Sequence, residues 1–474
     1  MTGLPCRQRG RRDPEQCGSR DPNSEDSLTV DPISMIPDFG NLAYTIGAFV
    51  VALSVIVAIH EYGHYIVGRW CGIHAEVFSI GFGPRLLTWR DKRGTLWQIA
   101  ALPLGGYVKF LGDSDPASGA DTEALRDMDA HTRRRTMHAA PLWARASTVA
   151  AGPVFNFVLS ILVFAGVMMA QGVAKAPLTI AEIKPMPEEV QALQPGDRIV
   201  AIHGREVPDF SEFGAFVNDL PQAPTLEYTI LRDGARMTVE APYPYPPRVS
   251  GVAPQSAAMA AGLEAGDVIV EVDGTRISSF DDLRSAVEVS EGEPLDLTVW
   301  RAGETFELSL TPKRTDMPLP DGGFEQRYLI GVTGGLFFAP ETQTPGPFTA
   351  LAAGAGQTLD IVQQSLSGLY HMITGAISTC NLSGPIGIAE TSGAAASQGA
   401  MNFIWFIAVL STAVGLINLF PIPVLDGGHL VFHAYEAIAG KPPSDGALRV
   451  LMAGGLALIL TLMVFAITND LFCP

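Results

Sequence analysis

Three polar residues, His60, Glu61 and His64, have the types and spacing of half a metal site. On a helix, two histidines four positions apart lie on one face, so both imidazoles can reach one metal ion. The glutamate beside the first histidine can then act as a general base on water. The pattern predicts the chemistry of a zinc hydrolase.

These residues stand at the end of an uncharged, mostly apolar segment that begins near Phe39. About 20 apolar residues suffice to cross the hydrocarbon of a bilayer as a helix. The same spacing also occurs by chance in soluble helices that bind no metal. Histidine and glutamate are costly in hydrocarbon, and they persist there mostly when paired, ligated or facing a cavity. Their position therefore favours metal binding over coincidence.

The composition is that of an integral membrane protein with a soluble part. Hydrophobic residues make up 47% of the 474 residues and charged residues only 17%, with a mean hydropathy of +0.23. The net charge of −18 comes with no basic domain that could neutralise phosphates, which argues against nucleic acid as a partner. The five cysteines are scattered singly, without a C-x-x-C pair.

Long apolar runs predict four transmembrane helices. They lie within residues 35–70, which carry the metal motif, 147–173, 401–423 and 450–470. Residues 71–146 are glycine-punctuated and rich in β-branched and aromatic residues, which predicts a re-entrant β segment followed by a loop. This segment either dips toward the metal or forms an ordinary cytoplasmic hairpin.

The other segments outside the soluble part are assigned from composition. Residues 1–34 are polar and are expected to be a disordered extension, unless translation starts at Met35. Residues 315–400 predict a linker followed by an amphipathic helix on the membrane surface. Residues 424–449 contain an L-D-G motif and are expected to form a cytoplasmic loop.

A soluble part repeats itself between the second and third spans. The stretch Pro195–Gly204 returns as Ala265–Gly274, which predicts β-rich domains over 178–245 and 246–314. Their G-D-x-I pattern resembles the PDZ family, whose members bind extended peptides as an added strand. Each copy could instead be a spacer or filter. The predicted fold class is a polytopic α-helical membrane protein, with four transmembrane helices and a membrane-associated β-hairpin or sheet, plus two tandem PDZ-like domains.

Four spans place residues 71–146 and 424–449 on one side of the membrane. The first of these segments holds a basic cluster that includes Arg85, Arg90 and Arg133, so the positive-inside rule makes this side cytoplasmic. The repeated domains then lie outside the cytoplasm.

The same topology brings the ends of the first and third spans together. Asp426 can then join His60 and His64 as an oxygen ligand, which leaves the open position of a catalytic zinc. Pro421 and Pro423 end the third helix, and Gly427-Gly428 is expected to let the backbone turn sharply.

Two further polar features leave alternatives open. His429 and His433 also have helical spacing, but they lack an adjacent glutamate and rank below the first pair as a metal site. Asn156 lies inside the second span and could either join the site or form a helix–helix hydrogen bond.

Several motifs occur in a characteristic order: H-E-x-x-H, G-F-G-P, L-P-L-G-G-Y-V-K, A-G-P-x-x-N, the repeated domains, S-G-P-I-G-I-A and N-L-F-P-I-P-V-L-D-G-G-H. Over about residues 35–474 the chain strongly resembles the site-2 protease family of intramembrane zinc metalloproteases. The resemblance implies one Zn²⁺ bound by His60, His64 and Asp426, with Glu61 as general base. It also maps substrate binding to Asn418, Pro421 and Pro423.

We further expect an unwound substrate strand to pair with the edge of residues 102–110, which includes Gly105, Gly106 and Tyr107. The resemblance implies regulated intramembrane proteolysis of single-span proteins in a bacterial inner membrane. The active site would lie near the cytoplasmic face, with the PDZ-like domains in the periplasm. Substrates would be an anti-sigma factor already shortened by a site-1 protease, or remnant signal peptides.

Two alternatives remain from other classes. A catalytically silent PDZ membrane scaffold would gather partners without using Glu61. A zinc transporter or sensor would need polar residues through several spans, whereas these spans offer almost none besides Asn156 and Asn418.

Overall fold

The computed structural model describes residues 39–113, 128–187, 192–319 and 323–472. The predicted extension over residues 1–34 lies outside this part. Phe39–Ala43 begin the first helix and belong to one compact unit, and the second unit runs from Tyr44 to Pro474. All contacts below lie within the second unit.

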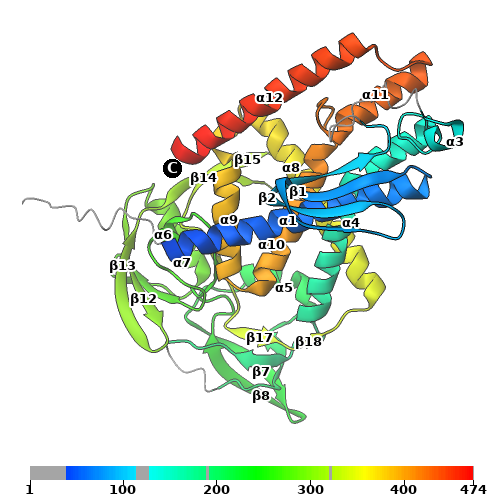
Figure 1. The fold of residues 1–474 in the computed structure, drawn as a ribbon. Coiled ribbons are helices and arrows are strands. Elements are labelled where there is room, and N and C mark those ends of the chain that lie inside the picture. Colours follow the sequence, from blue (N-terminus) through cyan, green and yellow to red (C-terminus); the bar gives the residue numbers. More distant parts are fainter. Residues whose placement is uncertain (1–38, 114–127, 188–191, 320–322, 473–474) are drawn as a thin grey trace, which may run out of the picture. The chain divides into compact units, whose positions relative to one another are not determined.

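The longer helices are α1 (Phe39–Trp70), α4 (Leu142–Gln171), α8 (Pro347–Ile373), α9 (Pro385–Ser397), α10 (Ala400–Asn418), α11 (Asp426–Ala439) and α12 (Asp445–Phe472). The short ones are α3 (Ala130–Arg133), α5 (Phe210–Asn218), α6 (Ala257–Ala260), α7 (Phe280–Val289) and the 3₁₀ turn η1 (Thr379–Asn381). Figure 1 follows them along the chain.

Four of these helices are long and apolar enough to cross a membrane. The stretches are Leu42–Trp70, Leu142–Gln171, Ala400–Asn418 and Gly446–Phe472. Together with the β-sheets, they fit a membrane protein that carries β domains.

A small sheet lies beside α1, built from β1 (Ala75–Arg90) and β2 (Leu96–Phe110). Residues 77–80 of β1 pair with 106–109 of β2 and also with 96–99. A strand has two edges, so these partners lie on opposite sides, and 106–109 forms an outer strand. Against α1 the sheet packs aromatic rings: Tyr65 lies 5.2 Å from Trp97 and 5.8 Å from Phe78, between ring centroids.

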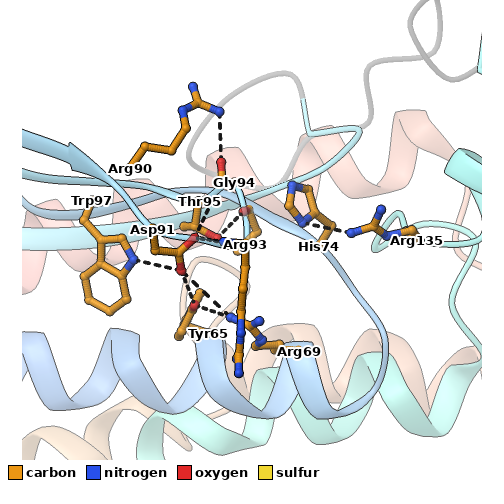
Figure 2. A network of polar contacts seen from close by, with 11 residues as sticks. Tyr65, Arg69, His74, Arg90, Asp91, Arg93, Gly94, Thr95, Trp97 and Arg135 are labelled. Atoms are coloured by element: carbon orange, nitrogen blue, oxygen red, sulfur yellow. Dashed lines mark hydrogen bonds and ion pairs between the residues drawn. The ribbon is translucent and has the colours of Figure 1, made fainter.

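Polar contacts also hold this sheet to α1, as Figure 2 shows. Asp91, in the turn between the strands, accepts hydrogen bonds from Tyr65 Oη at 3.2 Å and Trp97 Nε1 at 3.4 Å. Arg69 in turn donates to Tyr65 Oη at 2.6 Å. Because Tyr65 directly follows His64, the sheet is tied to the helix turn that carries the metal motif.

Two β-rich units follow, each with its own four-stranded sheet. The first has the order β6-β5-β7-β8 and the second β11-β10-β12-β13. The strands are β5 (Arg198–Ile202), β6 (Arg205–Glu206), β7 (Thr225–Arg232), β8 (Ala235–Pro242), β10 (Val268–Val272), β11 (Thr275–Arg276), β12 (Leu295–Arg301) and β13 (Glu304–Leu310). The sheets thus have equivalent orders, and each unit has its own buried apolar core.

An equivalent ion pair recurs in both units. Arg232 donates two hydrogen bonds of 2.7 Å to Asp197, and Arg301 donates bonds of 2.6 and 2.7 Å to Asp267. Both carboxylates are about 1% exposed. The aspartate of each repeated G-D motif therefore forms a salt bridge with an arginine of the same unit.

The segment expected to be a linker after residue 314 contains strands instead. The strands of this region and their partners are β14 (Lys313–Pro318), β15 (Phe324–Leu329), β16 (Val332–Gly334), β17 (Phe338–Pro340), β18 (Thr342–Gln343), β3 (Val173–Ala174), β4 (Ile180–Ile183) and β9 (Val249–Val252). β16 pairs with β9, β17 with β4 and β18 with β3. Proline and glycine content indicated a linker because it carries no information about such long-range pairing.

Another segment also differs from expectation. Residues 426–439 form helix α11 rather than a loop, because apolar residues follow the two glycines at helical spacing. The expected amphipathic helix corresponds to α8, which packs one face on α4, where a Cβ at Gly354 would lie 3.2 Å from the Ala165 nitrogen. Its location on the membrane surface stays a prediction.

Candidate metal centre

One helix and the start of a second bring three ligand atoms together. Nε2 of His60 and Nε2 of His64, both on α1, lie 3.2 Å apart. Oδ2 of Asp426, the first residue of α11, lies 3.1 Å from the former and 3.4 Å from the latter. Among the described residues these three form the one group placed to hold a metal ion. Three protein ligands with a free fourth position are the set that catalytic zinc uses.

The protonation of His64 follows from its second ring nitrogen. Nδ1 lies 2.8 Å from the backbone oxygen of Thr148, and a carbonyl oxygen can only accept a hydrogen bond. Nδ1 therefore carries the proton in the neutral ring, and Nε2 presents a lone pair toward Asp426. A lone pair facing a carboxylate at 3.4 Å is favourable when a cation lies between them.

The His60 ring is oriented by Asn156 of α4, which is fully buried. The side-chain amide of Asn156 lies 3.2 Å from Nδ1 of His60. An amide can present either its oxygen or its nitrogen at this distance. With the oxygen toward the ring, Nδ1–H donates to it and Nε2 is free to bind metal, as in His64. The backbone oxygen of Asn156 also accepts hydrogen bonds from Ser160 and Ser411. The side chain of Asn156 therefore lies beside a candidate ligand, and its backbone oxygen links α4 to α10 through Ser411.

Gly152 of α4 leaves the space that a metal ion needs. A Cβ at this position would lie 2.7 Å from Nε2 of His60 and 2.6 Å from Cε1 of His64. Gly63, inside the metal motif, lets the two helices approach, because its Cβ would lie 2.5 Å from the Ala151 oxygen. These roles are not apparent from the sequence, although small residues inside apolar helices often mark close helix contacts.

Asp426 reaches the histidines because the first turn of α11 packs tightly. Gly427 and Gly428 are buried, and a Cβ on either would clash with backbone oxygens of Leu419 or Ile422. Both glycines are helical, so the expected sharp turn at this point is wrong. Their role is close packing of helix against backbone, which no residue with a side chain would permit.

The outer strand of the sheet faces Glu61. The N–H groups along a strand point alternately to its two sides. The N–H of Phe110 points away from β1 and donates to Asp113 at 3.0 Å. The N–H of Val108, two residues earlier, points the same way and donates to the Glu61 carboxylate. A Cβ at Gly106 would lie 3.1 Å from Cγ of Glu61. The candidate base therefore lies beside the outer edge of this sheet.

The remaining predicted residues lie around this core in different settings. Tyr107 stacks on Phe82, and its hydroxyl accepts a hydrogen bond from Gln98 at 3.1 Å. A Cβ at Gly105 would also meet Phe82. Asn418 donates to the Val414 oxygen in its own helix, at 3.0 Å.

The segment after α10 and the second histidine pair complete the surroundings. Pro423 lies against α12: a Cβ added to Gly455 of that helix would lie 3.0 Å from Cδ of Pro423. Pro421 precedes it by two residues in the same segment. Of the rival pair, His429 and His433, neither joins the described ligand group. Burial and the charge of Arg145 lower the pKa of His433 to about 4.

Comparisons with known proteins agree with this site. Residues 48–462 match the family described as "Peptidase family M50". A "putative zinc metalloprotease" of Agrobacterium fabrum is 38% identical over 436 residues, which cover 91% of this chain and 97% of the relative. The regulator of sigma-E protease RseP of Salmonella typhimurium is 34% identical over 460 residues, which cover 91% of this chain and 99% of the relative. With four apolar helices and a three-ligand site, this chain is a zinc metalloprotease that belongs to peptidase family M50.

Proposed function

We propose that this protein is an intramembrane protease that cuts a peptide bond within the transmembrane segment of single-span proteins. The observation that carries the proposal is the position of His60 and His64 on the apolar stretch Leu42–Trp70, facing Asp426. A metalloprotease of this family with its ligands on a membrane-spanning helix would act on peptide bonds at that depth.

The chain's own residues divide the chemistry between them. His60, His64 and Asp426 would hold zinc, which lowers the pKa of water and polarises a carbonyl when bound. The Glu61 carboxylate would take a proton from the attacking water and pass it to the leaving nitrogen. Asn156 and the Thr148 oxygen keep both imidazole rings in the tautomer that this binding requires.

A helical substrate hides its peptide bonds, so it must unwind before attack. We propose that the unwound strand adds to the outer edge formed by Gly105, Gly106 and Tyr107. The support is the direction of this edge, which faces Glu61, while the opposite edge of the same strand pairs with β1. The segment with Asn418, Pro421 and Pro423 would bind the same strand.

Charge and cysteine chemistry support the orientation that we propose in a bacterial inner membrane. Basic residues in 71–146 favour a cytoplasmic position for the end of α1. Cys380, between the β-rich units and α10, is disulfide-bonded, whereas Cys71 is free. Disulfides persist in the periplasm and are rare in the cytoplasm. Both observations support an active site near the cytoplasmic face.

The two β-rich units would then be periplasmic PDZ-like domains that restrict access to the site. Their equivalent strand orders support this assignment. The substrates would be proteins shortened beforehand by a site-1 protease, such as an anti-sigma factor in a stress response, or remnant signal peptides.

The test uses the purified full chain in lipid with a single-span reporter, measuring zinc content and cleavage. Glu61→Gln should keep zinc and lower the cleavage rate by about 10²- to 10⁴-fold. Asp426→Ala should lose zinc. Glu212→Gln, at an exposed glutamate of α5, serves as the control and should change neither. A silent scaffold predicts no cleavage by the unmodified chain. Full cleavage by Glu61→Gln would refute the proposed mechanism.

A further inference from the structure

An ion pair joins α11 to α4 far from the candidate ligands. Arg145 donates from Nη2 to Oε1 of Glu436 at 2.6 Å and from Nη1 to Oε2 at 3.0 Å. The side chains are 19% and 18% exposed. A two-pronged Arg–carboxylate contact fixes the relative direction of both groups as well as their distance.

Helix α11 has few other contacts that could hold it. Its fully buried residues are Gly427 and Gly428, and residues 429–439 are half-buried or exposed. Its main partner among the described elements is α4. The first turn is fixed by the two glycines, and the ion pair of Glu436 joins α11 to α4 at a second point, ten residues after Asp426.

The partner helix is also the frame of the metal centre. Arg145 lies three residues before Thr148, whose oxygen binds His64, and seven before Gly152, which lies against both histidines. Asp426 and Glu436 are ten residues apart, about 15 Å along α11. One helix thus contacts both histidines directly and, through this ion pair, the helix that carries the third ligand.

Nearby His433 leaves the pair undisturbed. Burial and the adjacent charge of Arg145 keep the pKa of His433 at about 4, so the ring is neutral near pH 7. It therefore does not compete with Arg145 for the Glu436 carboxylate.

We propose that Arg145 and Glu436 are positioning residues that align α11 and so place Asp426 against His60 and His64. This inference rests on the ligand set proposed above. Neither residue touches the metal, substrate or ligand atoms, and their effect would pass along the helix. Loss of the pair should weaken zinc binding although all three ligands remain.

The experiment measures zinc affinity of the detergent-solubilised full chain by competition with a chelator. The variants are Arg145→Gln, Glu436→Gln, their double variant and Arg145→Lys. The lysine keeps the positive charge but cannot form the two-pronged contact with the carboxylate. The control is Lys175→Gln, which breaks an exposed ion pair with Glu341 beyond the other end of α4. Hydrogen exchange of residues 427–439 in the zinc-free protein gives a readout that needs no bound metal.

Each single variant should raise the zinc Kd about tenfold or more and speed exchange in α11, while Lys175→Gln changes neither. Because the residues act as a pair, the double variant should bind zinc no more weakly than the weaker-binding single variant. Arg145→Lys should fall between wild type and Arg145→Gln. Zinc Kd values within twofold of wild type in both single variants, or fold-changes that multiply in the double variant, would overturn the proposal.

A separate variant tests the ligand set on which the inference rests. If Asp426→Ala binds zinc as tightly as wild type, the ligand assignment is wrong. If Asp426→Ala loses zinc while the ion-pair variants bind normally, only the positioning role is wrong.

Discussion

A Cβ atom on Gly152 would lie 2.7 Å from Nε2 of His60. This is shorter than any ordinary carbon–nitrogen contact, and the hypothetical atom would stand in the space toward which both imidazoles point. The absence of a side chain on α4 is therefore part of the metal centre, as much as the ligands on α1 and α11.

Gly152→Ala should consequently lose zinc while the chain still inserts and folds. The added methyl group must displace an imidazole or separate α1 from α4, and we expect the zinc Kd to rise at least about tenfold, which is about 1.4 kcal/mol. Gly166→Ala is a matched control on the same helix, because nothing lies within 4 Å of its Cβ position. Metal analysis of both purified variants checks the prediction, and normal zinc in Gly152→Ala would contradict it.

Asn156→Ala should weaken zinc binding without removing a ligand. The variant frees the His60 ring from the group that orients it, and outer partners of this kind are worth about 10- to 100-fold in metal affinity. Asn156→Asp keeps an oxygen for Nδ1–H and should bind more tightly than the alanine variant. Chelator competition measures both, with Asn402→Ala on α10, whose side chain bonds Gln398 instead, as control. Equal affinity of Asn156→Ala and wild type would argue against the role.

Val108→Pro should lower cleavage while zinc content stays normal. The N–H of Val108 points away from β1, so proline leaves the ladder between β1 and β2 intact and alters the outer edge together with the hydrogen bond that this N–H makes to Glu61. Val108→Ala keeps the N–H and serves as control. Cleavage of a single-span reporter and zinc analysis together decide the matter, and unchanged cleavage would rule out strand addition at this edge.

Arg232→Gln should destabilise the first β-rich unit in a pH-dependent way. Burial opposes ionisation of Asp197, but the hydrogen bonds from Arg232 and the Gln194 amide lower its pKa below the usual value. A depressed carboxyl pKa stabilises the fold above the unfolded pKa of about 4, and this contribution disappears as the pH falls through the folded pKa.

Breaking such a buried pair costs about 3 kcal/mol at pH 7, and the difference from wild type should shrink below pH 4. Limited proteolysis of the full chain in denaturant measures the effect. Arg205→Gln, which breaks an exposed pair with Asp219, is the control and should cost no more than about 1 kcal/mol. A pH-independent difference would contradict the explanation.

The chemistry and the membrane class could both be predicted from local features of the amino-acid sequence. His60 and His64 are four residues apart, a spacing that the helix period converts directly into a shared face. The apolar runs that become α1, α4, α10 and α12 are likewise local signals, because length and composition suffice to recognise them. Even Asp426 could be placed beside the histidines, since four spans leave few ways to arrange the ends of two of them.

Only the tertiary structure decided how the site is supported. Gly152, Thr148 and Asn156 contact histidines that lie 84 or more residues away, and no local pattern distinguishes them from ordinary residues of an apolar helix. The strands at 332–340 pair with partners 80 or more residues earlier, and composition, which carries no information about such pairing, indicated a linker. Local periodicity is fixed by a few neighbouring residues, whereas packing depends on which distant surfaces meet, and that becomes visible only in the folded chain.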